Sequence, residues 1–235
     1  MKRLLTTLVV LTGLLGSGGA VWAQDYLKGV KAWLNSDYAT ALKEFRPLAE
    51  QGDADAQHYL GGHYRLGYGV TQDYAEAVKW YRKAAEQGHK WAQYYLALMY
   101  DDGQGVTQDF AEAAKWFRKA AEQGHAEAQY VLGVSYDNGK GVTQDFAAAM
   151  KWFRKAAEQG NARAQLYLGV MYDIGNGVLQ DMIAAHMWFN IAAANGNTDA
   201  AKARDMAAEK LSSSDIVKAQ QKAKRCMASG YKDCD

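Results

Sequence analysis

The chain has 235 residues, of which 49% are hydrophobic and 23% are charged, a composition that suits one ordinary domain or a short array of repeats. Its single proline and 23 glycines argue against disorder and favour helices joined by glycine turns. Two of the 27 basic residues, Lys2 and Arg3, lie in a predicted leader. Without them, 25 basic and 26 acidic residues remain, which gives a net charge of −1. This balance argues against the basic stripe that nucleic-acid binding requires.

The N-terminal segment has the three parts of an export signal. Lys2 and Arg3 supply positive charge, residues 4–15 form an apolar core, and small residues lead to a cleavage site after Ala23. The alternative is a membrane anchor, but about 12 apolar residues fall well short of the roughly 20 that span a bilayer. We therefore predict a mature chain that begins at Gln24, is periplasmic or secreted, and has no membrane insertion after cleavage.

A spacing of 36 residues organises the centre of the chain. The returning positions are the glycines Gly52, Gly88, Gly124, Gly160 and Gly196, the pairs that begin at Ala56, Ala92, Ala128 and Ala164, and the tryptophans Trp80, Trp116, Trp152 and Trp188. The segment GVTQD also returns three times, followed by one GVLQD. Such regular returns predict an array of structural repeats.

Each repeat is predicted to hold two helices, which we call helix A and helix B. In the first repeat Ala56, Leu60 and Tyr64 recur every four residues and share one apolar stripe of helix A. Gly67 and Gly69 then end the helix, because glycine adopts backbone angles that other residues resist.

Helix B of the first repeat is predicted to begin after Asp73, whose carboxylate can accept hydrogen bonds from the free amides of the first turn. Its buried face is predicted to comprise Ala77, Trp80, Tyr81, Ala84 and Ala85. The alanines let helices approach closely, and the aromatic rings fill the space between them.

The pattern AQxxLGxxYxxGxGVxxDxxxAxxWYxxAAxQG closely resembles the Sel-one-like repeat, a longer relative of the tetratricopeptide repeat. The resemblance implies an all-α, right-handed superhelical solenoid of antiparallel helix pairs, with a concave surface lined mainly by the A helices. Terminal units of such arrays need a polar cap, since they have no neighbour on one side. The predicted boundaries are a signal peptide over residues 1–23, a truncated N-terminal repeat without the GxG loop over 24–51, full repeats over 52–87, 88–123, 124–159 and 160–195, and a C-terminal helical cap over 196–235.

The two cysteines, Cys226 and Cys234, belong to this cap. In an oxidising compartment they can close a short loop and pin the C-terminus to the last helix. The alternatives are free thiols, a bridge to a partner chain, or a metal site, the last disfavoured because the tail has no histidine. Family members often carry a bridge within each repeat, and this chain lacks those cysteines.

Some members of the resembled family are labelled as hydrolases of β-lactams, which makes catalytic motifs relevant to this chain. The spacing SxxK occurs once, at Ser229 and Lys232, without a KTG or SDN companion. His58 and His63 lack a recognised metal spacing, and the repeated GxG follows a helix rather than the strand that phosphate loops need. We predict no catalytic residues, no metal and no cofactor.

Helix A positions that differ between otherwise near-identical repeats are the candidates for binding. At 100° per residue, they point away from the core direction set by Leu60. The resemblance adds that tetratricopeptide relatives bind ligands there. The predicted partner-binding residues are His58, Arg65, Trp91, Tyr94, Leu98, Asp101, Tyr130, Val134, Asp137, Leu166 and Asp173. The alternative is that some of these side chains form the core between repeats, because helix A packs on both neighbours.

These observations favour a protein–protein interaction module, a scaffold or regulator of the bacterial envelope, that binds a protein or peptide on its concave face. Aromatic anchors would supply most of the affinity. One alternative is a hydrolase of β-lactams or peptidoglycan, suggested by the labels of some relatives. A second is a secreted factor that meets host proteins.

Overall fold

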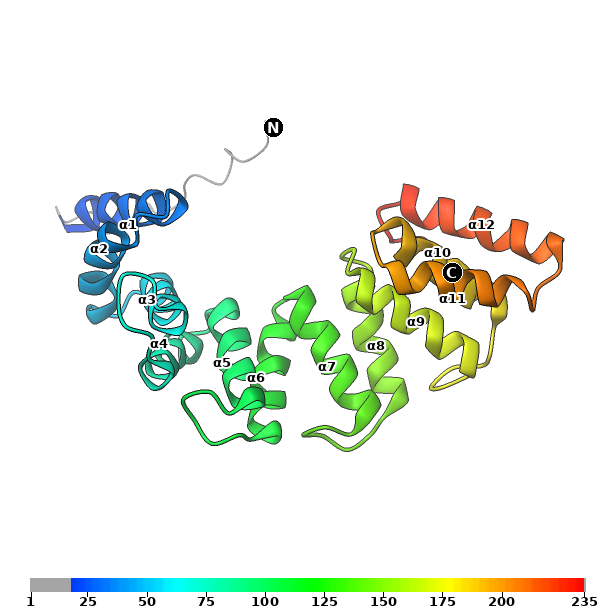
Figure 1. The fold of residues 1–235 in the computed structure, drawn as a ribbon, viewed down its shortest axis with the longest axis horizontal. Helices are drawn as coiled ribbons and strands as arrows, with labels where there is room; N and C mark the ends of the chain where they lie inside the picture. The colour runs from blue at the N-terminus through cyan, green and yellow to red at the C-terminus, as the bar shows by residue number, and fades with distance from the viewer. Residues whose placement is uncertain (1–17, 235) are drawn as a thin grey trace. The chain divides into compact units, whose positions relative to one another are not determined.

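The computed structural model describes residues 18–234, which form helices and connecting loops without a strand in that range. Figure 1 shows the helices in chain order. Their bounds are α1 Gly18–Leu34, α2 Tyr38–Glu50, α3 Ala54–Leu66, α4 Tyr74–Glu86, α5 Lys90–Asp102, α6 Phe110–Glu122, α7 Ala126–Asn138, α8 Phe146–Ala157, α9 Ala162–Ile174, α10 Met182–Ala194, α11 Thr198–Ala208 and α12 Ser213–Ala228.

The chain divides after His89 into an N-terminal unit with α1 to α4 and a C-terminal unit with α5 to α12. Within each unit every helix packs on the next one along the chain, except that α12 packs on α10 instead of α11. In the predicted repeats α3, α5, α7 and α9 are the A helices, and α4, α6, α8 and α10 are the B helices. The structure therefore confirms the all-α architecture of paired helices.

The first helix crosses the predicted cleavage point. It begins at Gly18, and residues 1–17 of the predicted signal peptide lie outside the described residues. The unit predicted as truncated, 24–51, takes part in a full pair of helices, α1 and α2, joined by a loop of three residues that has no GxG element. Cleavage before Gln24 stays a prediction. Within residues 18–234 no helix combines the length and apolar character needed to cross a membrane.

An aspartate starts every B helix of the full repeats. The Asp73 carboxylate accepts from the amide of Glu76 at 2.9 Å, as predicted. Its counterparts are Asp109, Asp145 and Asp181, each accepting from the amide three residues later. Side-chain caps of this kind satisfy amides that the helix itself leaves open and typically stabilise by about 1 kcal/mol.

The second glycine of the GxG loop allows one repeat to touch the next. Gly141 has φ of +73°, and a Cβ added there would lie 2.0 Å from the carbonyl oxygen of Phe110, in the first turn of the preceding B helix. Gly177 meets Phe146 in the same way. Only glycine fits such a backbone contact at positive φ.

The glutamine of the repeated Ala-Gln pair makes the same hydrogen bonds in different repeats, and this shared role accounts for its recurrence. Gln129 is buried, donates to the carbonyl of Ala121 on the preceding B helix at 3.0 Å, and accepts from Gln159 after the following B helix at 2.7 Å. Gln57 makes the same two bonds in the N-terminal unit. One buried side chain thus fastens two successive B helices, where an unpaired polar group would be costly.

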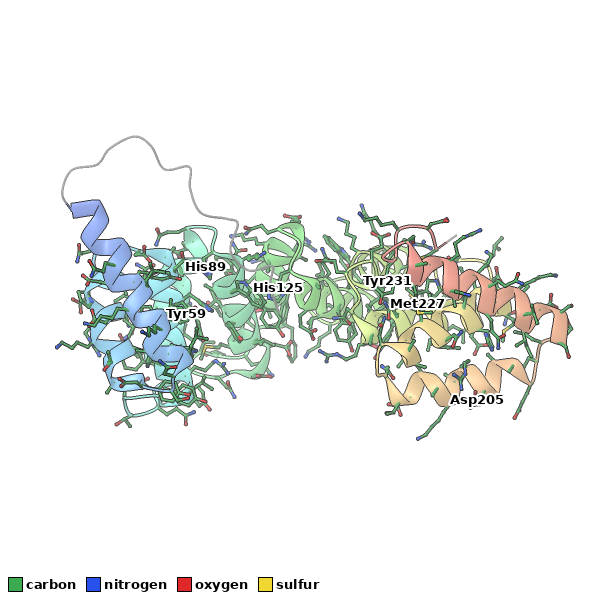
Figure 2. All side chains as sticks on the ribbon, turned by 90° about the horizontal axis from the view of Figure 1, so that it is seen from above. Tyr59, His89, His125, Asp205, Met227 and Tyr231 are labelled. Atoms are coloured by element: carbon green, nitrogen blue, oxygen red, sulfur yellow. A yellow bond between two sulfur atoms is a disulfide. The ribbon has the colours of Figure 1, made fainter. Side chains whose placement is uncertain are left out.

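The C-terminal cap is helical, and Cys226 and Cys234 are joined in a disulfide. The closed loop places Tyr231 against Gly160, with its hydroxyl donating to Asn195 at 2.9 Å. Met227 and Tyr231 both pack against the core of this unit (Figure 2). The disulfide loop therefore covers the end of the last full repeat.

Candidate protein-binding face

The A helices of the C-terminal unit, together with α11 at the corresponding place in the cap, carry an apolar row at one repeat position. It consists of Leu98 on α5, Val134 on α7, Val170 on α9 and Met206 on α11. Leu98 and Val134 are half-buried, whereas Val170 is 37% exposed and Met206 63% exposed. The apolar row thus becomes more exposed to solvent toward the cap.

Three residues further along the chain from each member of the apolar row lies an acidic row. It is formed by Asp101, Asp137 and Asp173 on the A helices and by Glu209 just after α11. Lys140 pairs with Asp101 at 2.8 Å, and Lys210 pairs with Asp173 at 3.1 Å. The same three aspartates offer their backbone carbonyls to the glutamine of the following loop. Asp101 and Asp173, both predicted to bind a partner, therefore already stabilise the array.

The two tyrosines predicted as anchors are half-buried between repeats. Tyr94 stacks on His125 with ring centres 4.5 Å apart. Tyr130 lies beneath the Arg163 guanidinium and contacts the rings of Phe153 and Tyr167. Burial raises the pKa of Tyr130 to about 12. Both rings serve inter-repeat packing, the alternative that the sequence left open for this face.

Two of the predicted aliphatic residues also contribute to packing. Leu166 is half-buried and packs against Ala185, Phe189 and Ala207. Val134 packs against the core cluster that includes Phe153 and Leu168. Leu166 and Val134 therefore belong to the packing between helices, and the more exposed part of the apolar row is its other end, at Val170 and Met206.

His58 and Arg65 belong to the N-terminal unit, and the other predicted residues belong to the C-terminal unit. His58 stacks on His89, which pairs with Asp55 at 2.9 Å. Burial, followed by the charge of His89, lowers the pKa of His58 to about 3. Arg65 donates to the Tyr81 hydroxyl at 3.3 Å. Both side chains thus have local structural partners.

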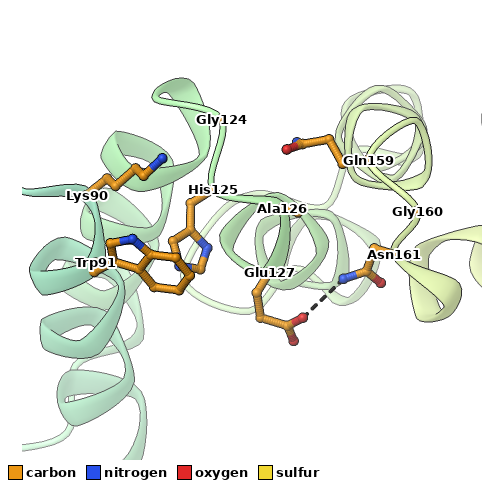
Figure 3. Close-up of a pocket in the computed structure, with 9 residues that line it drawn as sticks. All are labelled: Lys90, Trp91, Gly124, His125, Ala126, Glu127, Gln159, Gly160 and Asn161. Atoms are coloured by element: carbon orange, nitrogen blue, oxygen red, sulfur yellow. Dashed lines mark hydrogen bonds between the residues drawn. The ribbon is translucent and has the colours of Figure 1, made fainter. Parts of the chain in front are cut away.

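A pocket of about 440 Å³ opens where the A helices of the C-terminal unit begin (Figure 3). Trp91 is 47% exposed on its rim and meets the ring of His125 edge to face, with centres 4.2 Å apart. The pocket is lined by Lys90, Trp91, Gly124, His125, Ala126, Glu127, Gln159, Gly160 and Asn161. Trp91 is the only predicted binding residue among these lining residues.

His125 is 5% exposed and caps α7, because its Nδ1 accepts from the amide of Ala128. Its Nε2 has no hydrogen-bond partner within residues 18–234. Burial, reinforced by the nearby charge of Lys90, lowers the pKa of His125 to about 4. The imidazole is therefore neutral at physiological pH, and Trp91 covers a largely apolar ring.

The Ser229–Lys232 match lies in a turn. The Ser229 hydroxyl donates to the carbonyl of Cys226 at 2.8 Å and accepts from the amides of Lys232 and Asp233. These bonds close the C-terminal end of α12, so the spacing has a structural explanation. In the described part of the chain no group of three or more His, Cys, Asp or Glu side chains is arranged to hold a metal ion.

Two features of this surface escaped the sequence prediction. Met206 was assigned to a cap that departs from the repeat, although it lies 36 residues after Val170. His125 was not among the predicted binding residues, and its contact with Trp91 spans 34 residues. Continuing the repeat count into the cap would have found Met206, whereas the aromatic contact depends on side-chain packing.

The helix pairs and their repeated contacts define a helical-repeat protein of the tetratricopeptide-like class. The model of the Sel1 repeat matches residues 54–89, 92–125, 126–161 and 162–197. The chain therefore belongs to the Sel1 repeat family, whose members generally act as protein-interaction modules.

Solved structures support this assignment. A protective antigen present in uropathogenic Escherichia coli strains, displaying an SLR fold, is 41% identical with a TM-score of 0.74; the match covers 76% of this chain and 39% of that protein. A Sel1 repeat protein from Oxalobacter formigenes is 37% identical with a TM-score of 0.72, covering 74% of this chain and 72% of that one. A comparison with curated proteins gives no match.

Proposed function

We propose that the chain is an interaction module of the bacterial envelope that holds a peptide segment of a partner protein along the apolar row of its C-terminal unit. The observation that carries this proposal is the return of Leu98, Val134, Val170 and Met206 at one position of α5, α7, α9 and α11, with Val170 and Met206 exposed. The export-like N-terminus and the disulfide support an envelope location.

The exposed end of the apolar row supplies the binding energy in this proposal. Side chains of successive A helices touch, as Tyr130 on α7 and Tyr167 on α9 do, so their axes lie roughly 10 Å apart. A segment in the polyproline II conformation advances about 3.1 Å per residue and returns the same face every three residues, which is about one turn for each A helix. An apolar side chain at that interval would cover Val170 and then Met206. Burial of these contacts contributes about 1 to 2 kcal/mol of affinity.

The test uses random peptides displayed on phage and selected against the wild-type chain. The double variant Val170→Thr, Met206→Gln keeps side-chain size and helix propensity close to the original while removing apolar contact. We expect the selected peptides to bind it roughly tenfold more weakly, measured by fluorescence anisotropy.

Leu179→Gln is the matched control, since Leu179 is 88% exposed but lies in the loop between α9 and α10 and is not part of the apolar row. It should bind the selected peptides as the wild type does. Equal affinity of all three proteins, or a selection that enriches no peptide, would contradict the proposal.

A further inference from the structure

The acidic row beside the apolar row is neutralised at alternate places. Lys140 lies in the loop after α7 and neutralises Asp101 on α5, 39 residues earlier. Lys210, just after α11, neutralises Asp173 on α9. Asp101 and Asp173 are therefore each paired with a lysine that follows the next helix of the row.

Asp137 on α7 is the exception between them. The residue 39 positions later, where a lysine would match Lys140, is Asn176. Within residues 18–234 the Asp137 carboxylate makes no ion pair, and burial raises its pKa above the ordinary value. A half-buried carboxylate without a counter-charge costs free energy that a cation at hydrogen-bonding distance would recover.

Asn176 holds the same backbone place as Lys140. The Asn176 amide donates to the carbonyl of Met171 at 3.1 Å, and the Lys140 amide donates to that of Ser135 at 2.9 Å. The two loops share their local fold, and the third and fourth repeats differ in the charge carried at this point. The missing ion pair at Asp137 thus results from one side chain, which is asparagine at position 176 instead of lysine.

We propose that the partner is a basic segment, which places a lysine or arginine against Asp137 while its apolar side chains cover the neighbouring Val134 and Val170. The inference rests on the proposed function and adds the charge of the partner to it. In this arrangement the partner's cation takes the place that Lys140 and Lys210 take at the other two aspartates. Charge complementarity of this kind sets orientation as well as affinity.

Three synthetic peptides test the proposal, built from repeats of Leu-Ser-Lys, Leu-Ser-Gln or Leu-Ser-Glu, with acetylated and amidated ends. Their apolar side chains recur at the interval that the A helices set. We expect the lysine peptide to bind the wild type about tenfold more tightly than the glutamine peptide at low salt, and the glutamate peptide to bind most weakly.

The variant Asn176→Lys supplies the missing lysine from the chain itself. It should bring the affinity of the lysine peptide down to that of the glutamine peptide, while thermal unfolding shows a fold at least as stable as the wild type. Asp137→Asn should give the same loss by removing the carboxylate. Both variants should leave the glutamine peptide unaffected.

The outcomes separate the two proposals. If the lysine and glutamine peptides bind the wild type equally, or if Asn176→Lys leaves their difference intact, the basic-partner inference is wrong. Loss of glutamine-peptide binding in the Val170→Thr, Met206→Gln variant would still support the apolar row in that case. If none of the three peptides binds, both proposals fail.

Discussion

The first and second repeats use the same three positions in different ways. In the N-terminal unit, Asp55 and His89 form a polar pair with His58 stacked on the histidine. In the C-terminal unit the counterparts are Trp91, His125 and Tyr94, and the pair becomes an aromatic contact. The third repeat is polar again, with Asn161 donating to Glu127 at 3.1 Å.

The backbone around these positions stays the same while the side chains change. The bridging glutamine, the capping aspartate of helix B and the GxG loop are present in both units. Substitutions at the shared positions should therefore weaken the array in either unit. Exchanges at the edge position, which is Asp55 in the first repeat and Trp91 in the second, should change the surface chemistry with little loss of folding stability. This contrast can be tested.

The largest effect is expected from Gly141→Ala. Its Cβ would lie 2.0 Å from the carbonyl oxygen of Phe110, and the residue would keep a positive φ. We expect a loss of about 3 kcal/mol in the free energy of unfolding, from strain and overpacking together. Urea denaturation followed by circular dichroism measures it.

Gly124→Ala is the control for that variant. Gly124 also has positive φ, but an added Cβ meets no atom within 4 Å, so only the backbone cost of about 1 kcal/mol applies. The prediction fails if the two alanine variants lose equal stability. That result would mean that contact between repeats adds nothing to the glycine requirement.

A smaller loss, about 2 kcal/mol, is expected from Gln129→Ala. The variant leaves the carbonyl of Ala121 and the amide of Gln159 without their partner. Gln57→Ala removes the same two bonds in the N-terminal unit and should cost a similar amount. A neutral effect of both changes in urea denaturation would show that water replaces the glutamine.

The repeat framework was predictable because it depends on local rules. Aspartate caps, glycines at positive φ and apolar spacing act within one repeat, and Asp73, Gly67 and Trp80 behave as the sequence predicts. The role of Gln129 was not predicted, because its partners lie 8 and 30 residues away. Repetition showed that this residue mattered without showing which groups it joins.

The candidate face was harder to predict because helical geometry gives the direction of a side chain but does not show which residues of the next repeat lie in that direction. Tyr94 and Tyr130 were expected to point away from the core direction set by Leu60, yet neighbouring rings from the next repeat cover them. Asp101 and Asp173 meet lysines 39 and 37 residues later. Burial of a helix face in an array depends on both neighbours, which a single repeat does not contain.

The smallest effect is a loss of folding stability in mild acid, which directly tests the contact between Trp91 and His125. Burial and the charge of Lys90 lower the pKa of His125 to about 4, so the unfolded chain binds a proton there at higher pH than the folded chain. Between about pH 7 and about pH 5.5, where the comparison is made, stability should therefore fall by about 1 kcal/mol as the unfolded chain takes up this proton.

Trp91→Asp converts this edge to the pair that Asp55 and His89 form in the first repeat. A carboxylate beside His125 favours the protonated ring, so the pKa of His125 should rise by at least about one unit, read from its NMR chemical shifts. The acid-induced loss of stability should shrink accordingly. His125→Asn, which places the Asn161 cap at this position, should remove the contribution of this site without changing the fold. If Trp91→Asp leaves the pKa unchanged, the two edges differ in more than the side chain at this position.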